Sequence, residues 1–253
     1  MKRYKTSAEL KDIAKGRLRG NYGTCILTYL LPILIITTAL IPLFFFLIMF
    51  TGLSQVLTGS PVNENVITAC SYGITVVSTL FQYIFTAGTT LFYLNMACGR
   101  RFSISDIFFG FRWQFKKTLG ISLFLLIPFL VCNLPYWVCY SIWESGRQFE
   151  WGIAALIAYL VDMAVYIPVS LMLSQAFYLL LDFPQYSVMQ LINLSCRVMK
   201  GHKGRLFYIG LSFIPLKLLA ILSLGIGFLW VYPYQYMTQT LFFLDLMNPQ
   251  EES

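Results

Sequence analysis

Long stretches without a charged residue constrain this chain more than any other feature. The first runs from Gly20 to Asn63 and holds 44 residues, and a second runs from Asn65 to Gly99. A helix needs about 20 apolar residues to cross the hydrocarbon core of a bilayer. Only 11% of the 253 residues are charged, less than half of the roughly 25% that a water-soluble domain carries. We therefore expect a membrane protein built from several transmembrane helices.

The apolar segments predict an all-α, polytopic transmembrane helix bundle that occupies residues 1–253 as a single integral membrane domain. Pro32 and Pro42 lie inside the first span, where kinks rather than breaks are expected. Tyr232-Pro233-Tyr234 indicates a turn, which leaves a last helix of about 20 Å, either a thin span or a helix at the membrane surface. We expect about six spans, near residues 24–50, 67–97, 118–141, 151–181, 205–231 and 234–247.

The positions of Lys and Arg predict the orientation of these spans. Three segments on one side carry 16 of the 18 basic residues: the stretch before the first span, residues 100–117, and residues 197–205. The alternate loops carry only Arg147, and Lys217 lies inside a span. Cytoplasmic loops are enriched in Lys and Arg, so a cytoplasmic N-terminus is expected. The tail after Met247 has no basic residue, and the side of the C-terminus stays open.

Two amphipathic helices are expected on the cytoplasmic side, at residues 6–20 and 184–200. Thr6 and Glu9 have the spacing of a capping box, and the first helix is expected to be an anchor that orients the first span, with lipid sensing as the alternative. Pro184 suits the first position of the second helix. Its polar residues recur at intervals of three and four along one face: Gln190, Asn193, Arg197 and Lys200.

A basic cluster closes the second amphipathic helix. Its members are Arg197, Lys200, Lys203 and Arg205. Such a cluster binds anionic lipid head groups in some membrane proteins and is a plain topology signal in others. Both interpretations stand at this point, with anionic lipids of the inner leaflet as the expected partner.

Two charged residues fall inside predicted spans, and such residues suggest function because burying a charge in lipid is costly. Asp162 lies in the fourth span and Lys217 in the fifth. A lysine stem can carry its ammonium several ångströms along the bilayer normal. We predict an intramembrane ion pair between Asp162 and Lys217, either as a relay for protons or substrate or as a structural contact that sets helix register.

No motif for catalysis, metal binding or cofactor binding is present. The cysteines at 25, 70, 98, 132, 139 and 196 lack zinc or iron–sulfur spacing, and His202 is the only histidine. Cys70, Cys132 and Cys139 lie toward the outer side, where either free thiols or a disulfide would fit. Walker, Rossmann and hydrolase motifs are missing. We expect no enzyme activity, no cofactor and no nucleic-acid partner.

Short blocks in the C-terminal half carry a family pattern. They are Asp182-Phe183-Pro184, Met199-Lys200-Gly201-His202-Lys203, Gly225-Ile226-Gly227-Phe228-Leu229-Trp230 and Pro233-Tyr234. With them, the chain resembles a family of bacterial integral-membrane proteins known as domain of unknown function 975. The resemblance implies about six helices and carries no assigned activity. The layout is also similar to the membrane portions of some glycerophosphodiester phosphodiesterases, which hints at work on lipids.

Two functions are compatible with these features. The first is a non-enzymatic, multi-pass protein of the bacterial cell membrane that binds lipid or a membrane-protein partner. The second is a small transporter or exporter subunit, for example in peptide resistance, with Asp162 and Lys217 as its gate.

Overall fold

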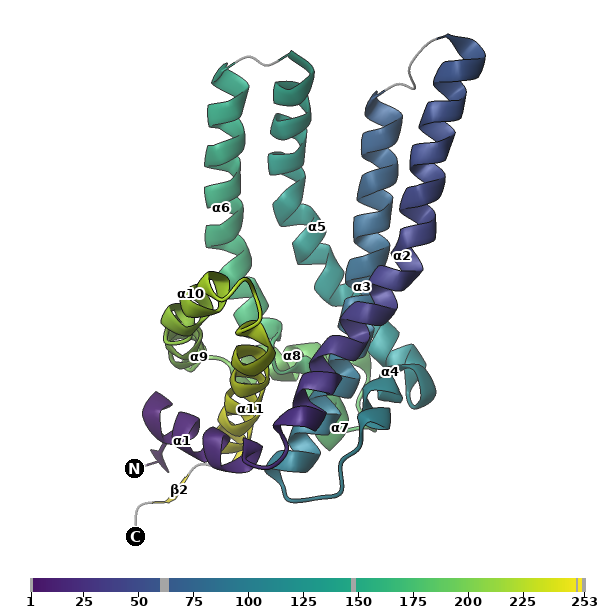
Figure 1. Ribbon diagram of the computed structural model, residues 1–253. Helices are drawn as coiled ribbons and strands as arrows, with labels where there is room; N and C mark the ends of the chain where they lie inside the picture. The colour runs from purple at the N-terminus through teal and green to yellow at the C-terminus, as the bar shows by residue number, and fades with distance from the viewer. Residues whose placement is uncertain (1, 60–63, 147–148, 249, 252–253) are drawn as a thin grey trace.

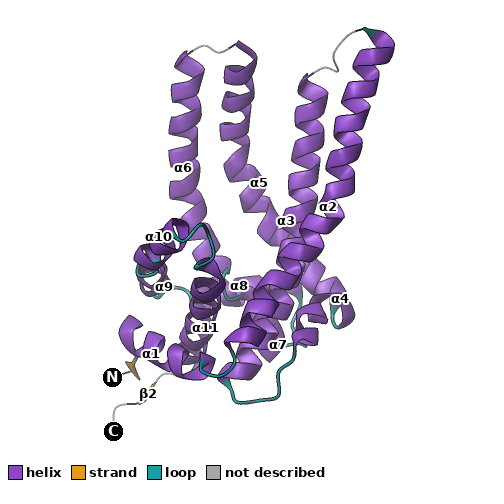
Figure 2. Cartoon of the chain, in the orientation of Figure 1, coloured by secondary structure: helices purple, strands orange, loops and turns teal. Residues whose placement is uncertain are grey.

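The computed structural model describes residues 2–59, 64–146, 149–248 and 250–251, so Arg147 lies outside the described residues. Within them the chain is helical apart from connecting loops and two strands of two residues each (Figure 2). The elements are β1 (Lys2–Arg3), α1 (Ser7–Leu18), α2 (Tyr22–Thr58), α3 (Glu64–Ala97), the 3₁₀ helix η1 (Ile104–Phe108), α4 (Phe109–Arg112), α5 (Phe115–Gly146), α6 (Phe149–Leu173), α7 (Ala176–Asp182), α8 (Val188–Val198), α9 (Lys203–Leu211), α10 (Ile214–Leu222), α11 (Phe228–Met247) and β2 (Gln250–Glu251).

Two long helical hairpins point away from the end of the molecule at which both termini lie (Figure 1). Helices α2 and α3 form the first hairpin, and α5 and α6 form the second. Helices α9, α10 and α11 form a third, shorter hairpin that ends well before the tips of the other two (Figure 1). The predicted all-α helix bundle is confirmed.

Five helical segments of the described residues are long and apolar enough to cross a membrane: Tyr22–Thr58, Val66–Ala97, Phe115–Trp143, Phe149–Asp182 and Lys203–Leu222. Helix α2 stays unbroken at Pro32 and Pro42, as expected for prolines in a membrane helix. Helix α11 is not one of the five, and 10 of its 20 residues are buried inside the protein. The last helix is thus the centre of the protein core.

The turn predicted at Tyr232-Pro233-Tyr234 is wrong, because Pro233 lies inside α11. The chain turns earlier, where Leu224 and Gly225 have positive φ angles of 54° and 87°. The Ser223 hydroxyl stabilises this turn, because its Oγ accepts a hydrogen bond from the backbone N–H of Gly227 at 2.9 Å. Proline removes one backbone donor, and in α11 the buried packing around Pro233 outweighs that loss. The segment predicted at 205–231 therefore ends at Leu222. The segment predicted at 234–247 belongs to a helix that begins at Phe228.

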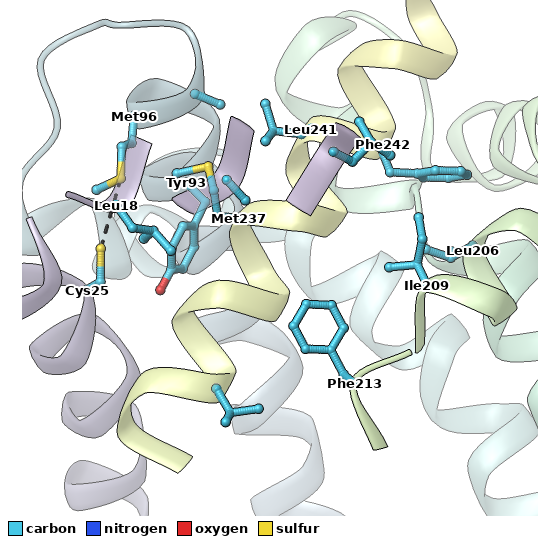
Figure 3. Packing of buried hydrophobic residues seen from close by; sticks show 14 of the residues in the cluster. Leu18, Cys25, Tyr93, Met96, Leu206, Ile209, Phe213, Met237, Leu241 and Phe242 are labelled. Atoms are coloured by element: carbon cyan, nitrogen blue, oxygen red, sulfur yellow. Dashed lines mark hydrogen bonds between the residues drawn. The ribbon is translucent and has the colours of Figure 1, made fainter. Parts of the chain in front are cut away.

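The main hydrophobic cluster surrounds α11 (Figure 3). It draws side chains from six helices, among them Leu18 of α1, Cys25 of α2, Tyr93 of α3, Ile209 of α9 and Phe242 of α11. The apolar face of α1 belongs to it, since Leu10, Ala14 and Leu18 are all fully buried. Helix α11 covers this face. The apolar face of α1 therefore packs on the protein core.

Side-chain caps define where the two amphipathic helices begin. The predicted capping box of α1 is present, with Thr6 and Glu9 each accepting from the other's backbone N–H. The second helix begins at Val188 and not at Pro184, because Ser187 and Gln190 form a capping box of their own. Its predicted polar face is exposed at Gln190, Asn193, Arg197 and Lys200.

A close approach between α3 and η1 depends on one glycine. A Cβ atom added at Gly88 would lie 1.9 Å from the backbone oxygen of Ile107. That oxygen belongs to the main chain and cannot rotate aside. Ile107 is itself fully buried, so a side chain at position 88 would force η1 away from α3.

We expect Gly88→Ala to destabilise the fold by about 3 kcal/mol, the upper end of the cost of overpacking. Gly73→Ala is the matched control, because it lies in the same helix with nothing within 4 Å of its added Cβ. The control should stabilise the helix by roughly 0.5–1 kcal/mol. Thermal unfolding in detergent, followed through the reactivity of the buried Cys25 thiol, compares the two. Equal midpoints would contradict the contact.

A buried carboxylate joins the two ends of the chain. Asp245 of α11 pairs with Arg205 of α9 at 2.7 Å, and the Asp245 side chain is 2% exposed. Both carboxylate oxygens also accept from the backbone N–H of Lys5 at 3.2 Å. Arg205 donates a further bond to the Lys5 carbonyl at 2.8 Å. The segment that leads into α1 is therefore held against α9 and α11.

Aromatic rings and a small sheet surround this carboxylate. The Arg205 guanidinium lies 4.7 Å from the Tyr4 ring and 5.2 Å from the Phe242 ring. His202 meets the Tyr4 ring edge-on at 4.7 Å, and burial followed by the Arg205 charge lowers the pKa of His202. Just beyond, β1 pairs antiparallel with β2. Both termini therefore lie at the same end of the molecule.

Replacing Asp245 with Asn should cost roughly 3 kcal/mol, because it leaves Arg205 without its anion in a largely buried site. Asp12→Asn is the control: Asp12 contacts Lys15 at 3.7 Å with both side chains mostly exposed, and such pairs contribute little. The same thermal assay in detergent should therefore separate Asp245→Asn from both wild type and Asp12→Asn. If the two variants unfold together, the carboxylate does not hold the N-terminal segment.

Candidate functional site

The predicted ion pair between Asp162 and Lys217 does not form within the described residues. Lys217 belongs to α10, and its Nζ lies 5.9 Å from the centroid of the Tyr232 ring on α11. Asp162 belongs to α6, and its Oδ2 is buried without a hydrogen-bond partner. The early turn after Leu222 folds α10 back onto α11. Lys217 therefore contacts the third hairpin and not the fourth span.

Asp162 lies close to a polar contact between the two long hairpins. Tyr166 follows it by one turn of α6, and the Tyr166 hydroxyl lies 3.4 Å from the Tyr83 hydroxyl of α3. The Tyr166 ring also meets Phe129 of α5 edge-on at 6.4 Å. These contacts join α3, α5 and α6 at one level. Sequence reasoning did not single out either tyrosine, and no spacing in the sequence relates two residues 83 positions apart.

A groove opens between α3 and α5, beside this contact. It has a volume of about 380 Å³, and its lining is almost wholly apolar. Its one amide side chain belongs to Asn133, whose Nδ2 donates to the Phe129 carbonyl at 2.7 Å. The groove therefore offers a mostly apolar surface. Its lining residues are Tyr72, Thr75, Val76, Phe129, Leu130, Asn133, Leu134, Trp137, Val138 and Ser141.

Aromatic side chains line the groove toward the tips of the hairpins. Tyr72 of α3 meets Trp137 of α5 edge-on at 4.4 Å. Trp137 belongs to a run of ring contacts along α5 with Tyr136 and Tyr140. Trp and Tyr are enriched at both membrane–water interfaces. The aromatic spacing of residues 136–143 was the sequence signal that could have located this groove.

The predicted head-group cluster is divided in the structure. Arg205 turns inward to Asp245, whereas Arg197 and Lys200 are exposed. Lys203 lines a separate depression between α6 and α9, beside Pro168 and Phe207. The structure therefore brings Arg205 to a structural ion pair and leaves the other three residues on the surface or at its edge.

Neither a disulfide nor a metal-binding cluster occurs among the described residues. All six cysteines are free thiols, so none of Cys70, Cys132 and Cys139 forms a disulfide here. In the part of the chain that the structure describes, no three His, Cys, Asp or Glu side chains gather as a metal site would require. An apolar groove lies between the two long hairpins.

Comparison with known families gives one match, which covers almost the whole chain. The model of the family described as "Protein of unknown function (DUF975)" matches residues 1–250. Neither the curated proteins nor the solved structures compared with the chain contain a match. Because the family model spans nearly every residue, from the first strand to the last, this chain belongs to the DUF975 family.

Proposed function

We propose that this protein is a non-enzymatic, multi-pass protein of the bacterial cell membrane that binds lipid, with an acyl chain in the groove between α3 and α5. The groove itself carries the proposal. Its volume of about 380 Å³ falls within the range of about 300–1,000 Å³ typical of small-molecule sites. Its walls are two helices that are each long and apolar enough to cross a membrane. The groove would therefore be in contact with the lipid of the bilayer.

The geometry of the hairpins supports the same ligand. Helices α5 and α6 pack along each other, and α3 contacts α5. Toward the tips the two hairpins separate (Figure 1), and the α3–α5 groove lies on their apolar flanks. A chain of methylene groups that fits the groove is held by van der Waals contacts with its lining. An aromatic pair, Tyr72 and Trp137, suits the level where a head group meets the acyl region.

The alternative of a transporter loses its main support. It relied on Asp162 and Lys217 as a gate, but Asp162 belongs to α6 and Lys217 faces Tyr232 on α11. Asp162 keeps an unpartnered oxygen, but one carboxylate without a second acid or a base makes no relay. A membrane-protein partner remains compatible with the apolar outer half of α2, whose most apolar window has no buried residue. Lipid covers such a face equally well, and the groove favours lipid.

The proposed orientation has the N-terminus in the cytoplasm. The segments that carry most of the Lys and Arg lie toward the end of the molecule that holds the termini (Figure 1), and cytoplasmic segments are enriched in these residues. Because β1 pairs with β2, the C-terminus follows the N-terminus to the same side. The hairpin tips then face outward.

Filling the groove tests the proposed lipid site. Leu130→Trp places a bulky ring in the lining, whereas Val131→Trp places the same ring one residue away, on a side chain that is 64% exposed and outside the groove. Losing on the order of ten carbon–carbon contacts of about 0.1–0.2 kcal/mol each costs about 1.4 kcal/mol, or tenfold in affinity. Native mass spectrometry of protein purified from membranes should show about tenfold less retained phospholipid for Leu130→Trp only. Equal retention in both variants would exclude this groove.

Labelling with a membrane-impermeant maleimide tests the orientation. Cys98 is exposed at the end of α3 nearest the termini, and Glu150 is exposed at the start of α6. In intact cells Cys98 should stay unlabelled until the membrane is permeabilised. A cysteine introduced by Glu150→Cys, in a variant with Cys98→Ser, should react at once. Labelling of Cys98 in intact cells would reverse the proposed topology.

A further inference from the structure

Two lysines of α1 converge on aromatic rings of the third hairpin. Lys11 Nζ lies 4.4 Å from the centroid of the Phe213 ring, and Lys15 Nζ lies 5.9 Å from that of the Tyr234 ring. The two rings meet edge-on at 5.0 Å, so the ammonium groups share one aromatic platform. We call these four residues (Lys11, Lys15, Phe213 and Tyr234) the lysine–aromatic site. None of them lines the groove between α3 and α5.

A proline creates the platform by interrupting a helix. Pro215 has no N–H, and its ring crowds the carbonyl four residues earlier, so the helix breaks between Leu211 and Ile214. The break leaves the Ser212 carbonyl accessible, and Lys11 Nζ donates to it at 3.0 Å. Phe213, at the break, is fully buried beneath the ammonium. Lys11 is thereby held in a defined position at the surface of the core.

The site carries an excess of positive charge. Lys15 has a weak contact with the exposed Asp12 at 3.7 Å, and Lys11 has no carboxylate partner in the described part of the chain. Burial and the neighbouring charge of Lys15 together lower the pKa of Lys11, as expected when two cations lie close without an anion between them. Lys217 adds a third ammonium one helical turn beyond Phe213, facing Tyr232.

We propose that the lysine–aromatic site binds a phosphate group, with Lys11 and Lys15 as its charged donors and Lys217 at its flank. A phosphate offers several acceptor oxygens and enough charge to satisfy more than one ammonium. The rings hold each ammonium by cation–π attraction without neutralising it. A phospholipid head group and a soluble phosphate compound share this chemistry. The site does not depend on the α3–α5 groove, and its failure would leave the groove proposal intact.

Thermal stabilisation of the full-length protein in detergent tests the site with three probes. They are inorganic phosphate, mixed micelles with phosphatidylglycerol, and mixed micelles with phosphatidylcholine. A ligand that binds the folded state raises the unfolding midpoint in a concentration-dependent way, which gives an apparent affinity. A rise with phosphatidylglycerol alone assigns a lipid head group, and a rise with inorganic phosphate as well assigns the phosphate group itself. If neither inorganic phosphate nor phosphatidylglycerol raises the midpoint, the proposal is overturned.

Variants then locate the effect. Lys15→Gln, whose lysine makes no bond to the backbone break, should weaken the apparent affinity severalfold, and Lys11→Gln with Lys15→Gln should weaken it about thirtyfold. Lys11→Arg keeps the charge and should keep the affinity within about threefold of wild type. Lys200→Gln removes one exposed charge elsewhere and serves as the matched control. A full response in the double variant, or an equal loss in Lys200→Gln, overturns the assignment to this site.

Discussion

The carboxylate of Asp245 is the contact on which the rest of the terminal end depends. It accepts from Arg205 and from the backbone of Lys5 at once, and it is almost fully buried. A buried anion is tolerated only when its partners are in place, so α9, α11 and the segment before α1 must assemble together. Once they do, α1 lies against α11 and its apolar face closes the main core. The position of Lys11 and Lys15 over the third hairpin follows from that docking.

Away from this end, the molecule obeys a different constraint. The two long hairpins carry apolar surface on nearly all sides, and water could not cover it. A bilayer removes the need for the helices to bury that surface against each other. The hairpins are therefore free to diverge, and the groove between α3 and α5 can persist. The buried base and the open hairpins suit the proposed function, since one part holds the protein together and the other meets lipid.

The sequence predicted the helical class, the first four apolar segments, the capping box at Thr6 and the wet face of α8. These features are local, because they depend on hydrophobic runs, charge spacing and hydrogen bonds across three or four residues. The prediction at Tyr232-Pro233-Tyr234 was wrong for the opposite reason: a proline usually ends a helix in isolation, yet Pro233 is surrounded by the core. The expected partnership of Asp162 and Lys217 did not form, because the path of the third hairpin depends on a break and a turn that hydropathy does not reveal.

By itself, the sequence determined that this chain enters a membrane as helices. Its apolar segments are long and almost free of charge, and in lipid a single segment can pair its backbone N–H and C=O groups only as a helix. The tertiary structure alone decided which residues meet. It paired Arg205 with Asp245, 40 positions apart, and it brought the lysines of α1 to rings some 200 positions later. Such contacts depend on how helices cross and where the chain reverses. Those choices are made by packing over the whole core, which no local pattern of residues encodes.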